Sequence, residues 1–306
     1  MGRILITGGS GLIGKHLCQM LTTKGYDTAI LSRSQELVPS VKTYVWDTDK
    51  RYIDPEALTG TDYIIHLAGA NIGEARWTKK RKKIIIESRT DSGLFLHEMI
   101  SRNNIGIRAF ISASAIGYYG AVTSERIYDE NDPPSNDFLG KTCLLWEQAS
   151  GKFSDSGIRT VIIRTGVVLT SKGGALASLV PPARYGLAVT LGKGNQYIPW
   201  IHIDDLCNIY LKAIEDNNMI GVYNAVAPEH TTNMELGKTL VLAVSGHAIS
   251  FRIPAAAFKI RYGEMADMLL YGSRVSSAKI IYAGYRFHYP EISKALADLY
   301  GKISNE

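Results

Sequence analysis

Three glycines spaced three residues apart follow the first apolar segment and constrain the fold more than any other feature. They belong to the run Gly8-Gly9-Ser10-Gly11-Leu12-Ile13-Gly14. Gly8 permits a tight turn out of a strand, Gly11 lets backbone approach a pyrophosphate, and Gly14 lets the next helix pack closely on that strand. The N–H groups at the start of that helix would face the phosphates. The spacing predicts a dinucleotide-binding loop, and an ordinary glycine-rich turn is the alternative.

The segments on both sides of this loop fit the prediction. Arg3 to Thr7 forms an apolar run typical of a buried strand. Lys15 to Lys24 has helical periodicity, with Leu17, Met20 and Leu21 on one face. Gly25 follows as a helix stop. The order strand, glycine loop and helix is the context that a dinucleotide site requires.

The chain is long enough for a large core, and its composition excludes several classes of protein. It has 306 residues, near the size at which one domain becomes two. No apolar run is long enough to span a bilayer, and because the first expected strand begins at Arg3 we expect no targeting peptide. A net charge of +5 suits an anionic cofactor without requiring nucleic acid.

Cysteine usage indicates a reducing compartment. Cys18, Cys143 and Cys207 are scattered and odd in number, so we expect no disulfide framework and a cytoplasmic location. No Cys/His cluster has metal-ligand spacing, so we expect no structural zinc.

Apolar strand-like runs alternate with helical stretches over the first half of the chain. This alternation predicts an α/β fold with a doubly wound parallel sheet, whose ligands lie at the carboxyl edge of the strands. The expected strands are 3–7, 26–31, 44–46, 62–67, 109–113 and 160–164, and the expected helices are 15–24, 77–102 and 144–154.

The pattern loosens after about Thr165, where glycine and proline pairs mark loops. We expect a Rossmann domain over 1–165, its last strands supplied from within 166–230, and a smaller, mostly helical substrate region over 166–306. The expected elements here are strands 200–203 and 222–225 and helices 204–215, 233–244, 255–270 and 290–301.

The end of the second strand distinguishes the two nicotinamide dinucleotides. An acidic residue there would bind the adenosine ribose, and a basic residue would accommodate a 2′-phosphate. This chain has Ser32-Arg33-Ser34, and Arg33 lies nineteen residues after Gly14, where the discriminating residue is expected. The pattern favours NADP. The alternative is that Arg33 is an ordinary solvated loop residue with no role in cofactor binding.

Two later stretches fit the same ligand. His66-Leu67-Ala68-Gly69 follows the fourth strand, where small residues let the cofactor lie against backbone. Ser112-Ala113-Ser114 ends the fifth strand, beside the expected nicotinamide.

Together these residues resemble the extended short-chain dehydrogenase/reductase superfamily, of the NAD-dependent epimerase/dehydratase type. The resemblance covers essentially the whole chain. Within the superfamily, the chain most resembles the atypical, epimerase-like family 39U. The strings that carry it are 67–72 (LAGANI), Arg76-Trp77, 87–89 (ESR), 112–120 (SASAIGYYG), Trp146-Glu147, 164–169 (RTGVVL), 199–205 (PWIHIDD) and 283–290 (AGYRFHYP).

The resemblance implies NADP bound by the glycine loop, Ser32 and Arg33, the Leu67-Ala68-Gly69 turn, Arg89, and backbone near Leu139. The helix from Trp77 also resembles a surface through which relatives pair, so a homodimer is one option, and the sequence leaves the oligomeric state open.

The catalytic signature of the superfamily is absent. Its chemistry uses a Tyr-x-x-x-Lys pair, in which the lysine lowers the pKa of the tyrosine. Aligning Trp146-Glu147 with that helix puts Leu139 at the tyrosine position and Cys143 at the lysine position, with Lys141 out of register. Leucine cannot exchange a proton, and a neutral thiol supplies no positive field to lower a neighbouring pKa.

Several residues are candidates to replace the pair. Ser114 matches the Ser/Thr position of the superfamily and would orient a carbonyl or hydroxyl. Tyr118 or Tyr119 would supply a phenol, unless both pack under the second domain. His202, Asp204 and Asp205 resemble an acid/base cluster, but an aspartate that caps a helix is the favoured interpretation. Cys143 has no activating neighbour in sequence.

The run Lys79-Lys80-Arg81-Lys82-Lys83 is the densest charge feature. A solvated helix start is the favoured interpretation. RNA contact is the alternative, but no interleaved aromatic residues supply a stacking surface.

Two functions remain open from the sequence. The favoured one is an NADP-dependent oxidoreductase or epimerase-like enzyme acting on a small carbonyl, hydroxyl or nucleotide-sugar compound, with Ser114 and Tyr118 in the site. The other is a non-catalytic NADP(H)-binding sensor or partner-binding protein. The substrate is not revealed by the sequence.

Overall fold

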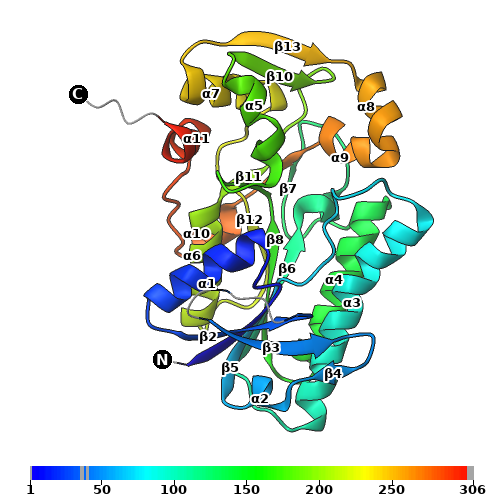
Figure 1. Cartoon of the computed structure of the whole chain (residues 1–306), viewed down its shortest axis with the longest axis vertical. Helices are drawn as coiled ribbons and strands as arrows, with labels where there is room; N and C mark the ends of the chain where they lie inside the picture. Colours follow the sequence, from blue (N-terminus) through cyan, green and yellow to red (C-terminus); the bar gives the residue numbers. More distant parts are fainter. Residues whose placement is uncertain (1, 35–37, 39–40, 302–306) are drawn as a thin grey trace.

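An eight-stranded sheet forms the centre of the computed structural model, which describes residues 2–34, 38 and 41–301 (Figure 1). The strand order is β12-β8-β6-β5-β1-β2-β3-β4, and every neighbouring pair is parallel except β3 with β4. The strands are β1 (Arg3–Thr7), β2 (Asp27–Ser32), β3 (Lys42–Asp47), β4 (Tyr52–Ile53), β5 (Thr61–His66), β6 (Ala109–Ala115), β8 (Arg159–Thr165) and β12 (Gly221–Ala225).

Helices cover both faces of this sheet, as the alternation predicts. On one face lie α1 (Leu12–Thr23) and α6 (Ile203–Glu215), and on the other α3 (Lys79–Arg102) and α4 (Phe138–Asp155) (Figure 1). Successive residues of β1 serve the two cores, since Ile4 and Ile6 pack in one and Leu5 in the other. The doubly wound α/β fold is therefore confirmed.

The second half of the chain crosses over the carboxyl edge of the sheet. Its short strands pair in parallel two-stranded sheets, β9 with β11 and β10 with β13, and β14 pairs in the same way with β7 from the first half of the chain. The further elements are α2 (Pro55–Leu58), η1 (Ile116–Tyr119), β7 (Ile127–Tyr128), β9 (Val167–Leu169), η2 (Gly174–Ser178), α5 (Val180–Ala183), β10 (Leu187–Leu191), β11 (Trp200–His202), α7 (Asn233–Ser245), β13 (Ile249–Ile253), α8 (Ala255–Tyr262), η3 (Gly263–Ala266), α9 (Asp267–Leu270), β14 (Arg274–Val275), α10 (Ala278–Tyr282) and α11 (Ile292–Tyr300).

One expected helix is wrong as a single element. Residues 255–270 form α8, η3 and α9 instead, because Gly263 adopts a φ of +61° that a continuous helix cannot accommodate. The strands at 187–191 and 249–253 are further differences from the expected elements. Both are short, and each pairs only with the other. Among the described residues, no helix is both long and apolar enough to cross a membrane.

Candidate dinucleotide site

Close backbone contacts shape the glycine loop between β1 and α1. Gly8 has a φ of +68°, which favours glycine. A Cβ on Gly14 would lie 2.3 Å from the Gly8 carbonyl oxygen and 2.6 Å from the Gly9 Cα. A Cβ on Gly11 would meet only the Gly8 oxygen, at 3.2 Å, so this backbone is open on its other side. Gly8 thus has the turn conformation and Gly14 the close approach expected for them, and the approach of a pyrophosphate to Gly11 stays a prediction.

The start of α1 leaves its backbone donors available. Its N-cap is Gly11, which has no side chain to accept from the first-turn N–H groups. Ser10 precedes the cap, and Leu12, Ile13 and Gly14 form the first turn. Positive partial charge and unpaired N–H groups make this helix start suited to a phosphate.

The strand register brings Ser32 and Arg33 to the same edge. Thr7 pairs with Leu31 between β1 and β2, so the glycine loop and the end of β2 leave the sheet side by side. Ser32 is buried and Arg33 is exposed to solvent. The cation that we expect at a 2′-phosphate thus follows the end of β2 at this edge, and its contact with a cofactor stays a prediction.

The turn after β5 packs directly on Gly8. The Ala68 N–H donates to Thr7 Oγ1 across 3.1 Å, and a Cβ on Gly8 would lie 2.8 Å from the Leu67 carbonyl. Beneath this turn the buried His66 contacts Thr7 Oγ1 through Nδ1 at 2.8 Å and Ser92 Oγ through Nε2 at 3.2 Å. Burial lowers the pKa of His66 to about 4, so this ring is neutral and structural.

Arg89 of α3 lies against Gly69. A Cβ on Gly69 would be 3.0 Å from the guanidinium carbon of Arg89. Arg89 donates to the carbonyl oxygens of Ala70 and Ile85 across 3.1 and 2.9 Å, and its guanidinium lies 5.0 Å from the Trp146 ring centroid. The structure therefore brings the glycine loop, Ser32 and Arg33, the turn 67–69 and Arg89 to one edge of the sheet.

The positions of the missing catalytic pair lie on the face of α4 that meets η1. Leu139 and Cys143 are both buried, and a Cβ on Gly117 would lie 3.3 Å from Leu139 Cβ and 3.7 Å from Cys143 Sγ. Burial, assisted by Glu147, raises the pKa of Cys143 to about 12. This face offers an aliphatic side chain and a neutral thiol, and Lys141 is exposed.

Ser114 enters a buried ion-pair network that the sequence did not indicate. Its Oγ donates to Glu147 Oε1 across 2.6 Å. Arg164 Nε donates to the same oxygen and its Nη2 to Oε2, each across 2.8 Å. Ser114 and Arg164 are also partners in the register between β6 and β8.

Both tyrosines of η1 are buried against this network. Tyr118 lies under Arg164, whose guanidinium carbon is 3.4 Å from the ring centroid. The Tyr119 hydroxyl accepts from Arg164 Nη1 across 2.9 Å and donates to Asn224 Oδ1 across 2.8 Å. Burial raises the pKa of Tyr119 to about 12. Tyr119 is therefore committed to packing and hydrogen bonding.

Sequence reasoning missed Glu147 and Arg164 as parts of the site. Both stand in strings that carry the family resemblance, yet nothing local in the sequence pairs them. They are 17 residues apart, on α4 and β8. A buried charge in each of two apolar elements was the available signal, because such charges are rarely left unpaired.

The cluster at the start of α6 joins three elements. The helix cap is His202 and not an aspartate, which corrects the sequence expectation: His202 Nδ1 accepts the Asp204 N–H across 3.2 Å. The buried Asp205 carboxylate instead accepts three hydrogen bonds from the segment after α10. The Tyr285 hydroxyl donates at 2.7 Å, and the His288 and Tyr289 N–H groups each donate at 2.9 Å.

His202, Asp204 and Asp298 are close enough together to suggest a metal site. His202 Nδ1 accepts a backbone N–H, however, so the ring proton must lie on Nε2, which faces Asp298 Oδ2 at 3.3 Å. A metal on Nε2 would have to displace that proton. We assign the cluster as a polar contact between α6 and α11.

The basic run forms the first turns of α3, whose cap is Thr78. Lys82 Nζ crosses to the second half of the chain and donates to Glu264 across 2.6 Å, and Arg81 pairs with Glu74 at 2.7 Å. Lys79, Lys80 and Lys83 are exposed, as expected for a solvated helix start.

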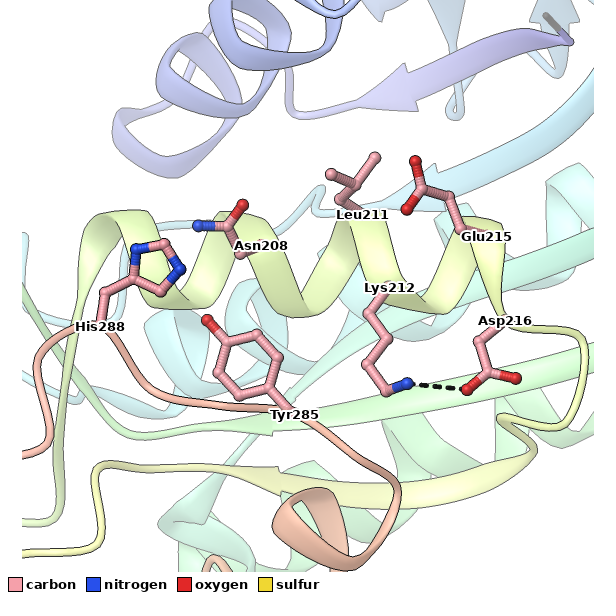
Figure 2. A pocket seen from close by; sticks show the side chains of 7 residues that line it. All are labelled: Asn208, Leu211, Lys212, Glu215, Asp216, Tyr285 and His288. Carbon is pink, nitrogen blue, oxygen red and sulfur yellow. Dashed lines mark hydrogen bonds and ion pairs between the residues drawn. The ribbon is translucent and has the colours of Figure 1, made fainter.

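A surface hollow of about 530 Å³ lies away from this edge, along the outer face of α6 (Figure 2). Tyr285 and His288 face the helix there, and Lys212 donates to Asp216 across 2.8 Å. None of the predicted site residues lines this hollow.

Comparisons with known proteins agree with the geometry. The profile of the NAD dependent epimerase/dehydratase family matches residues 4–226, and a domain of unknown function, DUF1731, matches residues 253–299. Epimerase family protein Mb2239 of Mycobacterium bovis is 34% identical over 96% of each chain. Human epimerase family protein SDR39U1 is 34% identical over 97% of this chain and 99% of its own.

Two solved structures superpose over nearly the whole chain. The human SDR39U1 (isoform 2) crystal structure with NADPH has a TM-score of 0.87 at 32% identity, covering 97% of this chain and 98% of that one. A nucleoside-diphosphate sugar epimerase from Corynebacterium glutamicum has a TM-score of 0.78 at 32% identity, covering 98% of this chain and 58% of that one. The glycine loop, the sheet order and these matches together show that this chain belongs to the NAD dependent epimerase/dehydratase family.

Proposed function

We propose that this protein is an NADP(H)-dependent oxidoreductase or epimerase-like enzyme acting on a small hydroxyl, carbonyl or nucleotide-sugar compound in a reducing, cytoplasmic compartment. The observation that carries the cofactor assignment is the shared edge of the glycine loop and Arg33, which offers N–H groups and a cation to a phosphorylated dinucleotide. The human relative solved with NADPH supports it. The three cysteines are all free and buried, which fits the compartment.

Within this family the nicotinamide supplies hydride transfer when it is bound. The protein residues nearest the expected reaction centre are Ser114, Leu139 and Cys143. Leu139 and Cys143 are both buried; leucine has no titratable group, and burial raises the pKa of Cys143 to about 12, so its thiol stays protonated near neutral pH. Ser114 is the polar group of this set, and Tyr118 contributes its ring to Arg164. The chemistry must therefore proceed without the usual tyrosine acid.

A fluorescence titration with NADPH and with NADH tests the cofactor assignment. We expect saturable binding with NADPH preferred. A panel of carbonyl compounds and nucleotide sugars, followed by NADPH absorbance, then tests for turnover. Absence of NADPH binding would refute the proposal.

A non-catalytic NADP(H)-binding protein is the second candidate. The burial of Leu139 and Cys143 where the proton-exchanging pair normally stands favours it. Tight NADPH binding, no turnover across the panel and a partner recovered only with cofactor present would select this alternative. The oligomeric state stays open, with a homodimer through α3 as one option, and the mass in solution would test it.

RNA binding is disfavoured because Lys82 and Arg81 are already paired. A salt-dependent RNA mobility shift that is lost on neutralising residues 79–83 would reverse that judgement.

A further inference from the structure

The hydroxyl of Ser114 has its single proton fixed by its neighbours. Ser114 Oγ and Glu147 Oε1 are 2.6 Å apart, a distance typical of a hydroxyl donating to a carboxylate. Both Glu147 oxygens accept from the Arg164 guanidinium across 2.8 Å, so Glu147 is an ionised acceptor with no proton to give. The proton between the two oxygens must belong to Ser114.

The surrounding contacts hold this arrangement rigidly. Arg164 is 2% exposed, its guanidinium is stacked on Tyr118, and its Nη1 donates to Tyr119 across 2.9 Å. Turning the Ser114 proton away would place two oxygen lone pairs against each other at 2.6 Å in a buried site. Ser114 therefore presents only lone pairs to anything else that reaches it.

Ser114 stands at the carboxyl end of β6, where ligands of such sheets lie. Ser114 itself is 2% exposed, between the partly exposed Ala113 and Ala115, and Cys143 and Leu139 lie one and two turns before Glu147 on α4. The residue thus borders the edge where the proposed cofactor is held.

We propose that Ser114 recognises its ligand solely as a hydrogen-bond acceptor, so that the group bound there is a hydrogen-bond donor, a hydroxyl, and not a bare carbonyl. Glu147 is the positioning residue that imposes this polarity, and Arg164 holds Glu147. The inference rests on the proposed NADP(H) site and deepens it: the ligand is an alcohol. A serine with a free proton would accept either group.

The test measures fragment binding to protein loaded with the tetrahydro analogue of NADPH, which cannot transfer hydride. Matched pairs such as cyclohexanol and cyclohexanone are compared by saturation-transfer NMR. One hydrogen bond corresponds to a preference of about twofold to tenfold, and we expect wild type to favour the alcohol by this factor. Ser114→Ala should reduce the ratio to about one, by removing the acceptor.

Glu147→Gln should lower the ratio toward one. Arg164 donates to both carboxylate oxygens, so a glutamine must place its amide N–H groups against one of these donors, and the arrangement that holds the serine proton is weakened. Ser112→Ala is the matched control, because Ser112 lies on the same face of β6 and bonds to Ser150 of α4 at 2.8 Å. That variant should keep the wild-type ratio.

The result that overturns the inference is wild-type protein that binds NADPH yet favours no alcohol over its ketone, or a Ser114→Ala variant with the wild-type ratio. Each variant is first titrated with NADPH. Failure of wild type at that step refutes the proposed function instead. Should Glu147→Gln not fold, the Ser114→Ala comparison decides alone.

Discussion

Gly14 in the first turn of α1 lies against the carbonyl oxygen of Gly8, and a Cβ at residue 14 would stand 2.3 Å from that oxygen. No side chain can relieve this contact by rotating, because both partners are backbone. The phosphate-binding end of α1 therefore keeps its position only while residue 14 is glycine.

Gly14→Ala should weaken NADPH binding by at least about tenfold and destabilise the fold by about 1–3 kcal/mol, through displacement of α1 from the loop. Fluorescence titration and urea unfolding measure the two effects. Gly151→Ala is the matched control, since Gly151 also lies within a helix but a Cβ there meets nothing within 4 Å. An alanine at residue 14 that binds NADPH as wild type does would disprove the assigned loop geometry.

Replacing Arg33 by glutamate should shift cofactor preference from NADP toward NAD. A charge-assisted hydrogen bond is worth about 1.5–3 kcal/mol, so the ratio of the two affinities should change by about tenfold to a hundredfold. Lys24→Glu makes the same change of charge at the far end of α1 and should leave the ratio alone. Equal ratios in Arg33→Glu and wild type would remove Arg33 from the site.

Stability should fall on mild acidification because of His66. Its pKa is about 4 in the fold, lowered by burial, against about 6.5 when unfolded. The unfolded chain therefore binds more protons, so this contribution is complete above pH 6.5 and is lost as the pH falls toward 4, by up to about 3 kcal/mol.

Urea unfolding at pH 7 and pH 5 checks this dependence. His66→Gln should flatten the difference between the two pH values, although it lowers stability at both by disturbing the contacts with Thr7 and Ser92. The exposed His247, changed to Gln, should leave the slope unaltered. An unchanged slope in His66→Gln would assign the acid sensitivity to other groups.

Lys82 and Glu264 connect the start of α3 to η3. Their side chains are 27% and 49% exposed, so a double-mutant cycle should give a coupling of only about 0.2–1 kcal/mol. Screening should reduce that coupling at 1 M salt. A parallel double-mutant cycle between Glu264 and Lys79, which is exposed on the same turn, should give no coupling energy. A salt-insensitive coupling would contradict an exposed ion pair.

The sequence alone determined the sheet, the loop and the edge at which a dinucleotide would lie. These follow from short-range rules: apolar runs of strand length, helical periodicity, and glycines whose spacing reflects backbone sterics within a few residues. The positions of Gly8, Gly11, Gly14, Ser32 and Arg33 could be predicted because each is defined by its distance along the chain from a strand end.

Only the tertiary structure decided what the polar residues around the reaction centre do. Ser114, Glu147 and Arg164 come from β6, α4 and β8, and the direction of the serine proton exists only when all three are packed together. The histidine cap of α6 and the hydrogen bond from Tyr285 to the buried Asp205 likewise depend on groups that only folding brings together. A hydrogen bond requires its donor and acceptor to be placed to within tenths of an ångström and at a suitable angle. The spacing of residues along the sequence does not specify this placement before the elements pack.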